Sequence, residues 1–258
     1  MEYRAIKLWI RNDVAVITLR RPEVMNALNT QMRAEITHAV KAAQDEARVL
    51  VMTGQGKSFC SGQDLGDGGN AAALDLERTL RDEYVPMLRA IVDCKIPTIA
   101  AVNGPAAGAG ANLALAFDVV IASDAAYFVQ AFTRIGLIPD AGGTHFLPRQ
   151  IGSARAMGAA LFADKISATQ AADWGMIYEC VPDDGFKEHW QDRAAHLAAG
   201  PTKAYAHLKT ALRASSENTF EKQLALEAKL QGKCGQTRDF QEGVVSFLQK
   251  RPPVYEGR

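Results

Sequence analysis

The apolar positions in the first two-thirds of the chain change repeatedly between strand-like runs and helical spacing. Two short apolar runs, AIKLWI (5–10) and VAVITL (14–19), flank a three-residue polar turn, which predicts a β-hairpin at the start of the chain. Residues 26–46 then place apolar side chains at helical spacing, with Asn29 or Thr30 as the helix cap. The pattern therefore predicts a hairpin followed by an amphipathic helix.

Further apolar runs continue this alternation and are separated by glycine-containing turns. The predicted strands are 48–54, 96–104 and 118–123, and the predicted helices are 74–93 and 110–117. A glycine-rich, flexible segment is expected at 66–73. Repeated strand–turn–helix units of this kind predict an α/β core.

From about Gly142 onward the pattern becomes helical, with one short strand expected near 177–181. We divide the chain into an α/β core over 1–195 and a C-terminal helical region over 196–258. The last helices carry apolar stripes that a lone helical appendage cannot bury. Their members are Ala204, Leu208, Leu212, Leu224, Leu226 and Leu230. Packing within the chain and packing against another subunit both remain open.

The composition of the chain argues against several classes of partner and ligand. The chain has 258 residues, and its 29 basic and 29 acidic side chains cancel, so nucleic acid and anionic membranes are not expected partners. The longest apolar runs are interrupted by polar residues and prolines, and the N-terminus lacks the pattern of a signal peptide. Four cysteines lie far apart without a C-x-x-C pair, and the histidines lack ligand spacing. We expect a cytoplasmic protein without a metal.

Two loops have the composition of an anion site. NGPAAGAGANLAL (103–115) and GKSFCSGQDLG (56–66) both follow a predicted strand, and their small residues let backbone N–H groups approach a ligand closely. Two such N–H groups can hold one developing oxyanion. Two alternatives remain: a dinucleotide fingerprint, although Leu113 stands at its third glycine position, or two tight strand-to-helix turns.

Four segments in this order resemble the signature segments of the crotonase, or enoyl-CoA hydratase/isomerase, superfamily. They are RRPEVMNALN (20–29), GKSFCSGQDL (56–65), AVNGPAAGAGANLALAFDVVIAS (101–123) and GLIPDAGGTHFLPRQIG (136–152). The resemblance covers nearly the whole chain. It implies a spiral of β-β-α turns and a C-terminal helical region that packs a homotrimer or a dimer of trimers.

The same resemblance implies chemistry on an acyl-CoA thioester, with coenzyme A as part of the substrate and no further cofactor. The backbone N–H groups that bind the thioester oxygen fall on Gln63 and Ala109. The residues implied to line the adenine and pantetheine path are Ala27, Gln63, Asp64, Leu65 and Gly66. Phe132 is expected in the pocket for the acyl group.

The resemblance also favours isomerisation over hydration. Hydratases of the family carry a glutamate at two positions, which match Asn112 and Phe132 here. Asp140 remains, at a position where several isomerases of the family keep their acid/base. A single carboxylate can move a proton from C2 to C4 through an enolate. We therefore predict Asp140 as the acid/base, with Asn112 hydrogen-bonding substrate or water.

Asp140 has a second interpretation, because an aspartate before Ala-Gly-Gly-Thr is a credible helix N-cap. If it is the acid/base, its apolar neighbours predict a poorly solvated carboxylate with a raised pKa. Those neighbours are Phe132, Ile135, Leu137 and Ile138.

Within the family, residues 132–152 and the C-terminal segment resemble isomerases that convert the ring epoxide of phenylacetyl-CoA to an oxepin. A Δ3,Δ2-enoyl-CoA isomerase of fatty-acid oxidation is the alternative. An enoyl-CoA hydratase and a non-catalytic acyl-CoA-binding scaffold remain as further alternatives. The scaffold would be indifferent to loss of the Asp140 carboxylate.

Overall fold

The computed structural model describes residues 2–66 and 75–258. The glycine-rich segment predicted at 66–73 lies, apart from Gly66, outside these residues.

The chain begins with the predicted hairpin. Strand β1 (Ile6–Arg11) pairs antiparallel with β2 (Val14–Leu19), from Ile6 opposite Leu19 to Arg11 opposite Val14. Asn12 and Asp13 form the two-residue turn with φ values of 50° and 61°. Left-handed conformations at both turn residues match the right-handed twist of the two strands. The hairpin prediction is confirmed.

The hairpin is one edge of a six-stranded sheet with the order β1-β2-β3-β4-β6-β9. All neighbouring strands beyond the hairpin run parallel. The other four strands are β3 (Val49–Gly54), β4 (Thr98–Val102), β6 (Val119–Ser123) and β9 (Glu179–Val181). The parallel strands are rich in apolar residues because both faces of the sheet are covered.

Helices cover both faces. Ile17 and Met52 face the core that includes α1 (Thr30–Glu46), whereas Val16 and Val51 face α7 (Phe186–Ala198). Alternate strand residues point to opposite faces, so one strand serves both cores. Helix α1 begins as predicted, because the side chain of Asn29 accepts a hydrogen bond from the N–H of Met32 at 2.9 Å.

A second, small sheet completes the fold. Strand β7 (Tyr127–Val129) pairs parallel with β5 (Ala106–Ala107) and antiparallel with β8 (Ile166–Ser167). A bridge between Cys60 and Ala106 adds one more residue to this sheet. Two successive turns of the chain, β4-β5-α4 and β6-β7-α5 (helices Ala109–Leu115 and Gly143–Phe162), each contribute a strand to the large sheet, a short strand to the small sheet, and a helix. This is the predicted β-β-α spiral.

The helix predicted over 74–93 is a rod of three segments among the described residues. These are α2 (Leu76–Thr79), the π-helical turn η3 (Leu80–Tyr84) and α3 (Val85–Val92). The N–H of Val85 bonds to the carbonyl of Leu80, five residues back, and Pro86 follows without an N–H.

The remaining elements of the core lie between β2 and α7. They are η1 (Pro22–Val24), α4 (Ala109–Leu115), η4 (Ala131–Ile135), α5 (Gly143–Phe162) and α6 (Ala168–Asp173). Helix α5, in the part of the chain predicted to be helical, is kinked at Gly152, whose φ is 76°.

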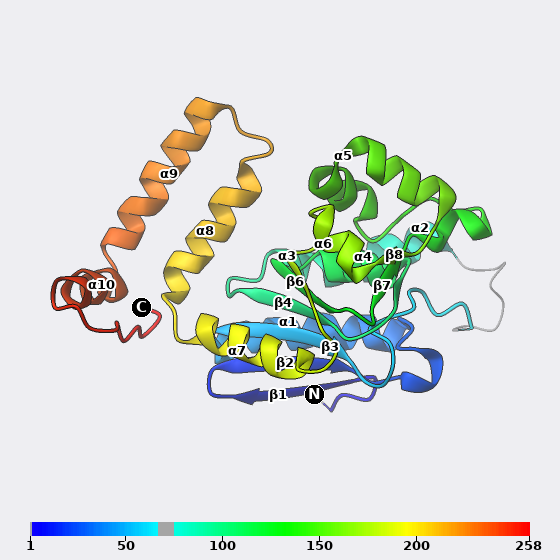
Figure 1. Ribbon diagram of the computed structural model, residues 1–258, viewed down its shortest axis with the longest axis horizontal. Helices are drawn as coiled ribbons and strands as arrows, with labels where there is room; N and C mark the ends of the chain where they lie inside the picture. Colours follow the sequence, from blue (N-terminus) through cyan, green and yellow to red (C-terminus); the bar gives the residue numbers. More distant parts are fainter. Residues whose placement is uncertain (1, 67–74) are drawn as a thin grey trace.

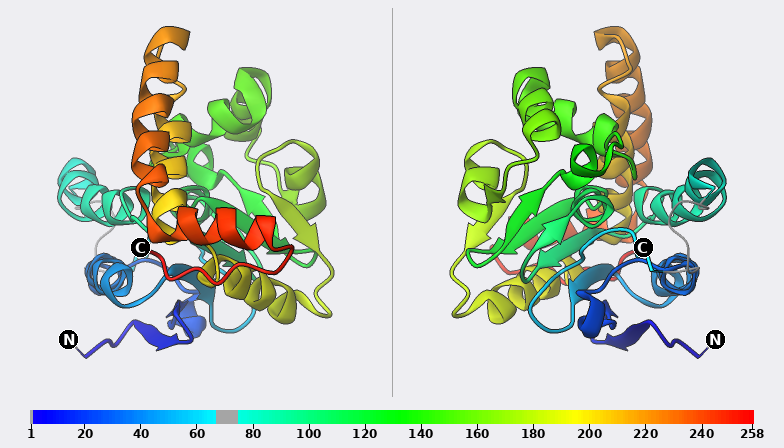
Figure 2. Two further views of the ribbon diagram at one scale, coloured as in Figure 1. Left: turned by 90° about the vertical axis from the view of Figure 1, so that its left-hand side faces the viewer. Right: turned by 90° about the vertical axis from the view of Figure 1, so that its right-hand side faces the viewer.

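Three helices follow the core: α8 (Thr202–Ala214), α9 (Phe220–Gly235) and α10 (Arg238–Leu248). Figures 1 and 2 show α8 and α9 standing beside the core and extending away from it. The division placed at 195/196 falls within α7, which packs on the sheet. Lys209 ties α8 to the core, because its ammonium group lies 2.7 Å from the Asp118 carboxylate and bonds the carbonyl of Ile96. Among the described helices, none is both long and apolar enough to span a bilayer.

Candidate active site

Asp140 lies in the turn between η4 and α5. Ala141 and Gly142 follow it with φ values of 48° and 84°, so the backbone reverses sharply before the helix begins. An alanine at positive φ stores backbone strain, which is typical of functional turns. The carbonyl oxygen of Asp140 accepts hydrogen bonds from the N–H of Gly143 and from the side-chain amide of Asn112, both at 2.8 Å. The backbone of Asp140 is therefore held from two sides.

The carboxylate of Asp140 is poorly solvated. Its Oδ1 is buried, and no hydrogen-bond donor reaches it within the described residues. Burial raises the pKa of Asp140 to about 6. The predicted rise in pKa is confirmed, but part of the predicted reason is wrong, because Ile135 and Ile138 are 57% and 76% exposed.

The capping interpretation of Asp140 is wrong. Gly142 is the N-cap of α5, and no side chain among the described residues caps this helix. Among the bonds of the described residues, Asp140 contacts the first turn through its backbone carbonyl, which accepts from Gly143. The carboxylate is thus left without a structural hydrogen bond at Oδ1.

Asn112 has a different place from the predicted one. Its side chain is 0% exposed, donates to the carbonyl of Asp140 and accepts from Nε2 of Gln130 at 2.9 Å. A Cβ on Gly143 would lie 2.3 Å from the Asn112 amide nitrogen, so glycine is required there. Asn112 therefore contacts Asp140 and Gln130 instead of an open face, and we treat it as a positioning residue. Gln130 has no motif that marks it in the sequence.

Gln63 and Ala109 lie close together, as the oxyanion prediction requires. A Cβ on Gly62 would lie 2.8 Å from the carbonyl oxygen of Ala107 and 3.3 Å from the nitrogen of Ala109, so the two loops touch backbone to backbone. Ala109 is the first residue of α4, where an N–H has no partner within the helix. In the described part of the chain, neither the Gln63 nor the Ala109 N–H has a protein acceptor.

Phe132 borders the same place. Its side chain is 7% exposed, and its ring approaches within 3.7 Å of where a Cβ on Gly108 would stand. Gly108 directly precedes Ala109, so the ring lies beside the second N–H. An apolar ring thus stands at the position where the family resemblance implies a glutamate in hydratases.

The residues predicted for the coenzyme A path also gather together. Arg21 donates to the carbonyl of Ala27 at 2.7 Å and forms an ion pair with Asp64 at 2.8 Å. Leu65 and Gly66 follow on the exposed side. Contact of these residues with coenzyme A stays a prediction.

Tyr84 is a buried residue that contacts the side chain of Gln63. Its hydroxyl donates to Oε1 of Gln63 at 2.7 Å. Burial chiefly raises the pKa of Tyr84, the positive charge of Arg33 opposes this rise, and the negative charge of Asp140 adds to it. Within residues 2–66 and 75–258 no cluster of three or more potential metal ligands is found.

A profile of the family described as enoyl-CoA hydratase/isomerase matches residues 10–258. The chain belongs to this family. A protein of Rhodobacter capsulatus named probable enoyl-CoA hydratase is 61% identical over the full length of both chains. The 1,2-epoxyphenylacetyl-CoA isomerase of Escherichia coli is 43% identical, with 96% of this chain and 97% of that protein covered.

Solved structures agree. An enoyl-CoA hydratase from Polaromonas sp. JS666 superposes with a TM-score of 0.93 at 32% identity, covering 98% of this chain and 100% of that one. The predicted crotonase fold is thus confirmed, and the chain is an enzyme of a family that acts on acyl-CoA thioesters.

Proposed function

We propose that this protein is an acyl-CoA isomerase in which Asp140 is the only acid/base and the N–H groups of Gln63 and Ala109 form the oxyanion hole. The observation that carries the proposal is the Asp140 carboxylate itself. Its Oδ1 is buried and has no donor among the described residues, and its pKa of about 6 suits a base near neutrality.

In the proposed reaction the carboxylate removes a proton from C2 of a 3-enoyl-CoA. The electron pair of the broken C–H bond forms the enolate, whose oxygen is held by the two N–H groups. The double bond then moves to C2–C3 as the protonated Asp140 returns the proton to C4. Each such N–H donor typically contributes about 3–4 kcal/mol to the transition state.

Hydration is the second candidate, because the Rhodobacter capsulatus relative is named probable enoyl-CoA hydratase. It is disfavoured by the two positions that carry glutamate in hydratases. Here one is the apolar ring of Phe132 and the other is Asn112, whose amide is bonded to Gln130 and Asp140. Neither position therefore carries a carboxylate that could help to activate water for hydration.

The acyl group that we favour is a ring epoxide of phenylacetyl-CoA, rearranged to the seven-membered oxepin without loss or gain of atoms. The likeness to the Escherichia coli isomerase supports this choice, and the buried Phe132 ring offers an apolar wall for an aromatic acyl group. The alternative is the Δ3,Δ2-shift of a linear enoyl-CoA, which uses the same three groups.

Three substrates test the proposal with the wild-type enzyme: a linear 3-enoyl-CoA, the ring epoxide of phenylacetyl-CoA, and crotonyl-CoA in water. We expect isomerisation of the first two, a higher kcat/KM for the epoxide, and no hydration of the third. Preference for the linear substrate would support the Δ3,Δ2-isomerase. Hydration of crotonyl-CoA as the fastest reaction would contradict the isomerase proposal.

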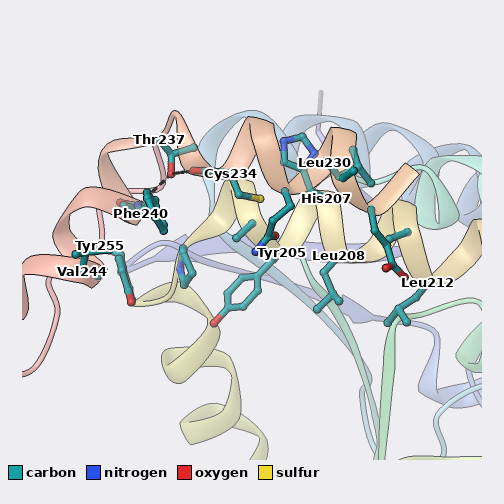
Figure 3. Close-up of a pocket in the computed structure, with 18 of the residues that line it drawn as sticks. Tyr205, His207, Leu208, Leu212, Leu230, Cys234, Thr237, Phe240, Val244 and Tyr255 are labelled. Carbon is teal, nitrogen blue, oxygen red and sulfur yellow. Dashed lines mark hydrogen bonds between the residues drawn. The ribbon is translucent and has the colours of Figure 1, made fainter. Parts of the chain in front are cut away.

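We also propose that copies of the chain assemble through the C-terminal helices as a trimer or a pair of trimers. A groove of about 1130 Å³ runs between α8, α9 and α10. Figure 3 shows Leu208 and Leu212 of α8 and Leu230 of α9 along it, with Phe240 and Val244 of α10 at its other end. Leu208 and Phe240 are 53% and 52% exposed in the single chain.

An apolar groove of this kind on a lone chain is suited to burial against another copy. Light scattering of the purified protein is expected to give three or six times the mass of one chain, and Leu208→Glu to lower it. A monomeric wild type would contradict this assembly. The cytoplasmic location and the absence of a further cofactor stay predictions.

A further inference from the structure

A buried arginine contacts the loop that carries Gln63 (residues 56–66, the oxyanion loop). It belongs to a helix that has no role in the proposed reaction. Arg33 of α1 is 2% exposed. Its guanidinium donates to Glu83 through Nε at 3.0 Å and through an Nη at 2.6 Å. It also lies over the ring of Tyr84, 4.8 Å from the centroid. A buried arginine is retained only where several partners satisfy it.

The same guanidinium holds Gln63 in two ways, directly through its side chain and indirectly through the backbone of Leu28. One Nη donates to the carbonyl of Leu28 at 2.6 Å and to Oε1 of Gln63 at 2.9 Å. Leu28 pairs with the oxyanion loop, because its N–H donates to Gly62 and its carbonyl accepts from Asp64. The two bonds of Leu28 therefore flank Gln63 and fix the plane of its backbone.

Tyr84 holds Gln63 from the other side. Its hydroxyl shares Oε1 of Gln63 with Arg33, and its side chain is 2% exposed. Tyr84 ends the π-helical turn η3, which also carries Glu83, the partner of Arg33. A π-turn inserted in a helix is frequent at functional sites because it re-aims side chains. Here it directs two successive side chains at Arg33 and Gln63.

Building on the proposed isomerase function, we propose that Arg33 and Tyr84 are positioning residues that hold Gln63 so that its backbone N–H points at the thioester oxygen. Neither touches the reacting atoms. Their effect passes through Oε1 of Gln63 and through the backbone of Leu28. The sequence offers no sign of this arrangement, because arginine on an amphipathic helix is usually solvated.

The first test is Tyr84→Phe, which removes one hydroxyl and keeps the ring. We expect kcat to fall about 10-fold with little change in KM, less than the roughly 100-fold or greater loss that follows removal of an oxyanion donor. Tyr3→Phe is the matched control, because the Tyr3 hydroxyl bonds only to His38 among the described residues. Its kcat should equal that of the wild type. An unchanged kcat in Tyr84→Phe would overturn the proposal.

A double-mutant cycle with Gln63→Met tests the path of the effect. If Tyr84 acts through Gln63, Tyr84→Phe should add no loss once Oε1 is gone. Losses that multiply in the double variant would show an independent action and overturn the proposal.

The carbonyl stretch of bound butyryl-CoA separates this proposal from the isomerase proposal, because it needs binding but no turnover. We expect a shift to lower frequency in the wild type and in Asp140→Asn, and a smaller shift in Tyr84→Phe. An equal shift in Tyr84→Phe would overturn the positioning role, whatever reaction the enzyme catalyses.

Arg33 is tested with its partner removed as well, because Arg33→Met alone leaves Glu83 buried and unpaired. The double variant Arg33→Met/Glu83→Gln is expected to regain the Tm that Arg33→Met loses, while its kcat stays low. Recovery of kcat together with Tm would make Arg33 purely structural.

Discussion

Replacing Asp140 by asparagine should stabilise the fold while it abolishes the proposed reaction. Burial raises the pKa of Asp140 from an ordinary value of 3.8 to about 6. At a pH above about 6 the folded protein must therefore hold a charge that the unfolded chain solvates better. At 1.36 kcal/mol per pKa unit, this difference costs up to about 3 kcal/mol, and asparagine removes it.

The stability gained by Asp140→Asn should increase with pH. Below an ordinary carboxyl pKa both states are protonated and the residue costs nothing; the cost grows as the unfolded chain ionises and is complete above about pH 6. The gain from Asp140→Asn should thus be about 3 kcal/mol at about pH 8 and about 1 kcal/mol at about pH 4.5. For a chain of this size the gain at about pH 8 corresponds to about 5–10 °C in Tm.

Thermal and urea denaturation at both pH values, followed by circular dichroism, would measure the gain. Asp164→Asn is the matched control, because Asp164 is exposed, and its Tm should not move. A variant at Asp140 that is no more stable than the wild type would refute the reasoning. A gain that does not shrink on acidification would refute it equally.

Three further results are expected. Gly62→Ala should cost about 1–3 kcal/mol of stability and lower kcat by about 10- to 100-fold. The reasons are that Gly62 has a φ of 97° and that an added Cβ would approach the Ala109 nitrogen. The control Gly158→Ala, on α5, places its Cβ in open space and should change neither stability nor kcat. Gln130→Leu should lower kcat by about 10-fold, because the Asn112 amide that holds Asp140 loses its partner; a wild-type kcat would contradict this. The kcat/KM for isomerisation should rise with pH through about 6, and a flat profile there would exclude Asp140 as the base.

The hairpin, α1 and the strands of the large sheet could be predicted because burial imposes a regular pattern on their residues. The short strands β5, β7 and β8 could not, because two or three residues carry no periodicity and their pairing depends on distant backbone. The turn at Asp140 and the loops at 56–66 and 103–115 could be recognised, because each is a continuous short segment with a distinctive sequence.

The contacts that surround the candidate site residues could not be predicted from the sequence. The sequence does not reveal that Asn112 faces Gln130 and Asp140, since all three come from different elements. Arg33 reads as a solvated residue of α1, whereas the fold buries it against Glu83. The capping interpretation of Asp140 was reasonable locally and fails because Gly142 takes that place.

The most direct measurement is the turnover of a 3-enoyl-CoA by wild type and Asp140→Asn, followed by the ultraviolet absorbance of the conjugated thioester. The account predicts that the variant binds the substrate as tightly as the wild type and that kcat falls by about 100- to 10,000-fold. A variant with wild-type kcat would contradict the assignment of Asp140 as the proton carrier.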